Sequence, residues 1–77
     1  MNINEFVEKF GEQLDDTDVS TLTPETKFRD LNEWRSLIAL SIIAMVDEEY
    51  EVTLKGADIQ ESQTIKDIFD KVVAKKV

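Results

Sequence analysis

Apolar residues recur at helical spacing in three separate segments, and this pattern constrains the fold more than any other feature of the chain. In the first segment Phe6, Phe10 and Leu14 stand four residues apart. A second segment covers about residues 37–51, and a third follows Thr64. Each pattern gives one buried face on one helix, so we predict an all-α fold with three main helices.

The connections between these segments differ in length. Residues 57–61, anchored by Ile59, are expected to form one short helix. Thr64 is placed to cap the last helix, with Asp67 as the capping-box acid three residues later. The first connection is a loop of about twenty residues, which is unusually long for a compact domain. This loop is expected to pin itself to the core through apolar residues spaced three apart, which are Phe28, Leu31 and Trp34.

Composition narrows the classes of function. We expect a single domain over residues 1–77, because a chain this short builds only one thin core. The chain has no cysteine and no histidine, which removes thiolate sites, the commonest general base and the commonest zinc ligand. Its net charge of −8 argues against nucleic-acid binding and favours basic protein partners. No carboxylate pair stands out as catalytic, so we do not expect an enzyme.

The sequence supports neither a calcium-binding loop nor a secretory or membrane-spanning segment. Residues 16–20 place acids at alternating positions, as a calcium-binding EF-hand loop does, but Thr21 and Lys27 stand where glycine and a bidentate glutamate are required. The start of the chain lacks the basic and apolar regions of a signal peptide, and the longest apolar stretch, residues 37–46, is too short to span a bilayer. We therefore expect a cytoplasmic protein without a membrane span.

Ser36 is the residue best placed to carry a chemical group. It stands directly before the apolar residues 37–40, where it is expected to be the N-cap of the second helix. Its hydroxyl should then lie at the surface, beside the positive end of the helix dipole. Unpaired backbone N–H groups in that first turn favour a phosphate ester on such a hydroxyl. The alternative is an ordinary N-cap that carries nothing.

The same helix also predicts a docking surface. The face expected to lie in the core comprises Ala39, Ile43, Val46 and Tyr50, flanked by Leu40 and Ile42. Leu37, Ile38 and Met45 are then left on its outer side. Asp47 and Glu48 follow, with no Lys or Arg between residues 37 and 54. Apolar surface beside acids suits a basic partner, and the alternative is that other elements cover Ile38 and Met45.

In this setting the chain resembles the acyl carrier proteins. The most specific matching element is the pair Ser36 and Leu37 at the start of an acidic helix. The other matching stretches follow in the same order along the whole chain, at residues 28–31, 47–50, 52–54 and 64–69. The resemblance implies a small four-helix bundle of acyl-carrier type, with three main helices, one short helix and a long first loop.

The resemblance implies a carrier and not a catalyst. In that family a phosphopantetheinyl transferase, with magnesium, moves phosphopantetheine from coenzyme A onto the serine, here Ser36. The thiol of this arm holds acyl groups as thioesters for synthesis enzymes of fatty-acid, lipid or secondary metabolism. Leu37 and Met45 map to apolar docking positions, and Asp47 and Glu48 to acids that meet basic partner enzymes.

Alternatives to this reading remain open. In one alternative, the arm carries an aminoacyl or peptidyl group in place of an acyl group. In another, the chain is an unmodified acidic interaction module that masks a basic partner. A monomer is expected in each case.

The stretch before the serine departs from the family pattern. The usual approach reads Asp-Leu-Gly-x-Asp-Ser-Leu, whereas residues 30–37 read Asp-Leu-Asn-Glu-Trp-Arg-Ser-Leu. Arg35 stands in the position of the aspartate and is a candidate contact for the phosphate, since a guanidinium binds phosphate through two parallel bonds. The alternative for Arg35 is a solvent-facing side chain. Trp34 is expected in the core, and the alternative is that it shelters the arm.

Overall fold

The computed structural model describes residues 2–76, and its first helix, α1 (Ile3–Gly11), begins at a side-chain cap. Asn2 Oδ1 accepts a hydrogen bond of 2.8 Å from the Asn4 amide, which satisfies one donor of the first turn. The predicted stripe of this segment, Phe6, Phe10 and Leu14, is buried throughout. The 3.6-residue period of the apolar residues therefore predicted the helix and its inner face, but α1 ends at Gly11, and Leu14 is buried from the turn that follows the helix.

The long connection after α1 contains two short 3₁₀ turns, η1 (Val19–Thr21) and η2 (Phe28–Asp30). Phe28 is fully buried, and Leu31 and Trp34 are half-buried against the core, so the prediction that this loop pins itself to the core is confirmed. The loop also meets the last helix. The carbonyls of residues 24 and 26 accept hydrogen bonds from the amides of residues 66 and 65, at 2.8 and 3.1 Å.

The second main helix is α2 (Ser36–Tyr50), and its buried face differs from the predicted one. Ile38 and Met45, predicted on the outer side, are only 4% and 6% exposed and belong to the core. Leu40, predicted beside the core, is 61% exposed. The buried set is Ile38, Ile42, Met45 and Val46. The helix is apolar on nearly every side over residues 37–46, so its neighbours in the fold decide which side is covered, and the sequence period does not.

The chain after α2 follows the prediction closely. Residues 52–54 form a link without helix or strand, in which Val52 and Leu54 are buried. The short helix α3 (Gly56–Gln60) begins one residue before the predicted range and is anchored by Ile59, which is buried.

The last helix, α4 (Ile65–Lys76), starts at the predicted capping box. Thr64 Oγ1 accepts from the Asp67 amide, and Asp67 Oδ2 accepts from the Thr64 amide, both at 3.1 Å. Each side chain thus satisfies a backbone donor of the other residue, and the predicted cap is confirmed. The inner face of α4 is formed by Ile65, Ile68 and Val72, which are all buried.

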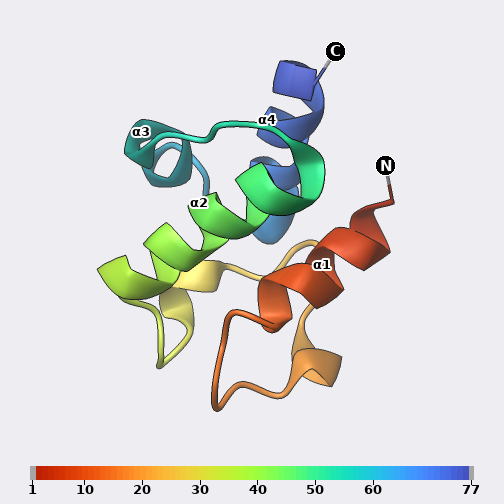
Figure 1. Ribbon diagram of the computed structural model, residues 1–77. Helices are drawn as coiled ribbons and strands as arrows, with labels where there is room; N and C mark the ends of the chain where they lie inside the picture. Colours follow the sequence, from red (N-terminus) through yellow and green to blue (C-terminus); the bar gives the residue numbers. More distant parts are fainter. Residues whose placement is uncertain (1, 77) are drawn as a thin grey trace.

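The three long helices contact one another pairwise, and α3 packs on α4 (Figure 1). Over residues 2–76 the chain forms a compact all-α domain with four α-helices and no strand, of which three helices are at least seven residues long. The predicted all-α class is therefore confirmed. No helix within the described range is both long and apolar enough to cross a bilayer.

Candidate functional site

Ser36 lies at the surface in the first turn of α2. The prediction that Ser36 is the N-cap is wrong by one residue, because the extended backbone of Arg35 (φ −163°, ψ 172°) occupies the cap position. The Arg35 carbonyl accepts the first helical bond, from the Ala39 amide at 3.1 Å. The Ser36 side chain is therefore not used for capping, and no hydrogen bond engages its hydroxyl within residues 2–76. The amides of residues 36–38 precede that first bond and have no helical acceptor.

The residue two positions before Ser36 is fixed by aromatic packing. The Trp34 ring stacks on Phe10, with ring centroids 6.3 Å apart and planes 5° from parallel. It meets Phe28 in a tilted arrangement at 4.6 Å. Trp34 is half-buried, so the prediction that it packs in the core is confirmed. The chain therefore enters α2 from a point that is anchored on α1 and on η2.

A hollow of about 360 Å³ opens beside Ser36, between α2 and α3. Its apolar wall is formed by Trp34 of the entry segment, by Ala39, Leu40 and Ile43 of α2 and by Ile59 of α3, so Trp34 packs on the core and also borders this hollow. Arg29 from η2 also lines it, and no Asp or Glu does, although the chain carries 17 acids. The exposed hydroxyl thus stands at an apolar hollow from which negative charge is absent.

Arg29 holds the far wall of this hollow in place. Its guanidinium Nη2 donates to the carbonyls of Ile59 and Gln60, at 2.8 and 2.7 Å. These carbonyls belong to the last turn of α3, where a positive charge is favoured. The guanidinium also lies over the Phe28 ring, 5.1 Å from its centroid. Arg29 therefore ties α3 to η2, a contact that the sequence did not predict.

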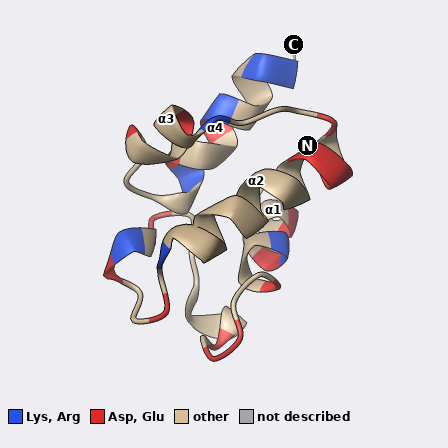
Figure 2. Cartoon of the chain, turned by 60° about the vertical axis from the view of Figure 1, so that its left-hand side comes forward, with Lys and Arg blue, Asp and Glu red and all other residues tan. Residues whose placement is uncertain are grey.

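The outward face of α2 combines apolar and acidic residues. At 100° per residue one face is shared by Leu37, Leu40, Ala44, Asp47 and Glu51, all of which are exposed. Leu37 and Leu40 are each 61% exposed, whereas Ile38 and Met45 are buried and cannot serve as docking contacts. Figure 2 shows most of α2 without charge and its C-terminal end in red. Asp47 and Glu48 make no ion pair among residues 2–76, whereas their neighbour Glu49 pairs with Lys9 at 2.9 Å.

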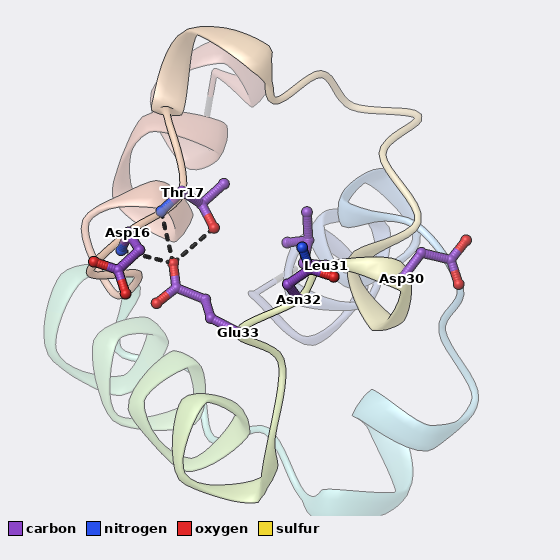
Figure 3. A pocket seen from close by; sticks show the side chains of 6 residues that line it. All are labelled: Asp16, Thr17, Asp30, Leu31, Asn32 and Glu33. Atoms are coloured by element: carbon purple, nitrogen blue, oxygen red, sulfur yellow. Dashed lines mark hydrogen bonds between the residues drawn. The ribbon is translucent and has the colours of Figure 1, made fainter.

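Glu33, three residues before Ser36, makes the largest set of hydrogen bonds near the site (Figure 3). Its carboxylate accepts from the amides of Asp15, Asp16 and Thr17 at 2.9, 3.0 and 2.8 Å, and from the Thr17 hydroxyl at 2.6 Å. The Thr17 hydroxyl and these amides lower the pKa of Glu33 to about 2, so the side chain is ionised at neutral pH. We call this arrangement the Glu33 clasp. No periodic pattern marks it in the sequence, because its partners lie 16 to 18 positions away.

The Glu33 clasp borders a second hollow, of about 490 Å³. Asp16, Asp30 and Glu33 are among the residues that line it. In Figure 3 the Glu33 carboxylate turns to the loop amides, while Asp30 lies apart on the other side of the hollow. Among residues 2–76, no group of three or more acidic, His or Cys side chains is placed to hold a metal ion.

Arg35, the candidate phosphate contact, is exposed next to Ser36. Its side chain makes no hydrogen bond or ion pair with the described part of the chain, so its guanidinium remains available to a ligand.

Comparison with known proteins found no matching family model, no matching curated protein and no matching solved structure.

Proposed function

We propose that this protein is a carrier whose Ser36 accepts a phosphopantetheine arm from coenzyme A and bears acyl groups on the thiol of that arm. The observation that carries the proposal is the Ser36 hydroxyl, which is exposed, unbonded and located at the start of α2 beside an apolar hollow without acids. In the proposed reaction Ser36 Oγ attacks the phosphorus of the donor that bears pantetheine. A new P–O bond forms between Ser36 Oγ and this phosphorus, and the P–O bond to the bridging oxygen of the diphosphate breaks. Adenosine 3′,5′-bisphosphate leaves with that oxygen and the electron pair, and the hydroxyl proton is released. A separate transferase with magnesium supplies the catalysis.

The surroundings of Ser36 support a phosphodiester at this position. The helix amides of residues 36–38 point their partial positive charge toward the attached group. Arg35 is exposed at the position before Ser36, and its guanidinium can donate two parallel bonds to phosphate oxygens. In a chain of net charge −8, no acid lines the adjoining hollow, so the hollow itself adds no repulsion to an attached phosphate.

The hollow between α2 and α3 supports a carrier role for the same serine. Its apolar wall can shelter part of an arm or of an acyl chain from water, which is favourable for each apolar group covered. The exposed Leu37 and Leu40 supply apolar contact for a partner enzyme, and Asp47 and Glu48 supply charge that steers a basic surface toward the helix. The partners in this proposal are the transferase and acyl-transfer or synthase enzymes with basic docking surfaces. The proposal also places the protein in the cytoplasm.

Intact-mass spectrometry tests the proposal directly. The purified chain is incubated with coenzyme A, magnesium and a transferase of broad specificity, and a gain of one phosphopantetheine is expected. Ser36→Ala should gain nothing, whereas the matched control Ser20→Ala, which changes another exposed serine, should be modified like the wild type. The proposal fails if the wild type gains no mass or if Ser36→Ala gains as much. The mass of protein isolated from its own cells then distinguishes acyl from aminoacyl or peptidyl cargo.

A second candidate function uses the same helix without the hydroxyl. The outward face of α2, with Leu37, Leu40 and Asp47, is by itself a surface for a basic protein, which an unmodified acidic module would mask. In that case protein from its own cells carries no adduct. Ser36→Ala then binds the partner as the wild type does.

A further inference from the structure

We propose that Glu33 is a positioning residue for Ser36: by clasping residues 15–17 it fixes the segment that leads into α2 and so presents the hydroxyl to the transferase. This inference rests on the proposed function. It concerns a residue outside the Ser36 hollow, which Glu33 does not line.

The clasp joins two parts of the first loop that lie far apart in the sequence. Three successive amides and one hydroxyl of residues 15–17 converge on one carboxylate, at 2.6 to 3.0 Å. Hydrogen bonds to an ionised acceptor are about twice as strong as those between neutral groups. A concave group of successive backbone N–H donors is itself a favourable site for an anion. The carboxylate is held there although Asp16 and Asp30 line the same hollow, so these donors outweigh the repulsion.

The clasp and the aromatic cluster hold successive residues of the entry segment. Glu33 is bound to the start of the loop, and Trp34 is stacked on Phe10 of α1. Only Arg35 separates these two anchors from Ser36, and its backbone is extended. A linker of one extended residue spans about 3.5 Å, which leaves the start of α2 little freedom to shift while both anchors hold.

This arrangement predicts a particular kinetic effect when the clasp is broken. Displacing a reacting group by about 1 Å can cost up to about a hundredfold in rate, because the transfer step depends on alignment of the hydroxyl with the phosphorus. The docking residues Leu40 and Asp47 are exposed further along α2, away from the entry segment that Glu33 holds, so binding through them should depend little on Glu33. We therefore expect the loss in kcat, with KM for the carrier changed little. A residue with only a structural role would alter the folded fraction and leave both constants of the folded protein unchanged.

The experiment measures transferase kinetics for Glu33→Ala, Glu33→Gln and Thr17→Val, with Glu25→Gln as the matched control. Glu25 is an exposed loop acid whose side chain makes no hydrogen bond within residues 2–76. All variants are first shown to be folded by far-UV circular dichroism. We expect kcat to fall about tenfold in Glu33→Ala, less in Glu33→Gln and Thr17→Val, and not at all in the control. Because Thr17 acts through Glu33, Thr17→Val should have no effect in the Glu33→Ala background.

The outcomes separate this inference from the proposed function. If the wild type is modified and Glu33→Ala is modified at the same rate, the positioning role of Glu33 is refuted while the carrier role stands. An equal fall in the control, or additive effects of Glu33→Ala and Thr17→Val, also refutes it. If the wild type is not modified at all, both proposals fail together. Faster hydrogen exchange of the Ala39 amide, the first amide of α2 with a hydrogen bond, in Glu33→Ala, with wild-type exchange in the control, would support the mechanism.

Discussion

Two neighbouring aliphatic residues of α2 should respond in opposite ways to truncation, and the pair tests the observed orientation of this helix. Ile38 is 4% exposed and belongs to the core, whereas Leu37 is 61% exposed on the outward face. Truncating a buried Ile to Ala typically costs 2–5 kcal/mol, so we expect Ile38→Ala to lower the free energy of unfolding by about 3 kcal/mol. Leu37→Ala should cost less than about 1 kcal/mol, because the residue buries little apolar surface to begin with.

The assay for this pair is unfolding by heat and by urea, followed by circular dichroism and by Trp34 fluorescence. For a domain of this size about 3 kcal/mol corresponds to a fall in Tm of about 12–24 °C, which is easily resolved. Leu37→Ala should shift Tm by only a few degrees. Equal losses in the two variants, or a larger loss in Leu37→Ala, would mean that α2 is rotated relative to the orientation described here.

Three further predictions concern charges and caps. The pKa of Glu33 is lowered from an ordinary 4.5 to about 2, so the contribution of this carboxylate to stability is fully present above pH 4.5 and is lost as the pH falls toward 2. Over this range the urea midpoint of the wild type should therefore fall more steeply with decreasing pH than the midpoint of Glu33→Gln. Parallel curves for the two proteins would contradict the clasp. Thr64→Ala should lower the free energy of unfolding by about 1 kcal/mol, measured by urea denaturation, because the Asp67 amide loses its acceptor. Reversing Asp47 and Glu48 to Lys should weaken binding of a basic partner, and more so at low salt; an affinity that is unchanged at every ionic strength would remove these acids from the docking face.

The sequence predicted the elements of the fold better than the orientation of its central helix. In the segment of α1 polar and charged residues separate Phe6 from Phe10, which stand four apart, so the two aromatic residues mark one helix face without ambiguity. The start of α4 was equally clear, because Thr64 and Asp67 form a local signal that needs no tertiary contact. Residues 37–46 of α2 are apolar except for Ser41, so several faces were compatible with the pattern. The face chosen from the sequence was wrong by roughly a quarter turn.

In the candidate site, too, the features set by neighbouring residues were predicted from the sequence, and the features that depend on long-range contacts were not. The position of Ser36 at the start of a helix followed from its immediate neighbours, with an error of one residue in the cap. The Glu33 clasp and the bonds from Arg29 to α3 join residues that are 16 or more positions apart. Neither has a period or a spacing by which a single sequence can reveal it. They depend on how the long first loop lies across the domain, which is set by tertiary contacts and not by local sequence.

The arrangement of α2 separates stability from recognition within one helix. Its inner residues, Ile38 and Ile42, are buried in the core that α1 and α4 also form, so substitutions there act on the fold. Its outer residues, Leu37, Leu40 and Asp47, are exposed, so substitutions there cost little stability. Under the proposed function this means that the surface met by partner enzymes can vary while Ser36 stays in place. The constraint on Ser36 comes instead from the entry segment, where the Glu33 clasp and Trp34 hold the chain from outside the helix.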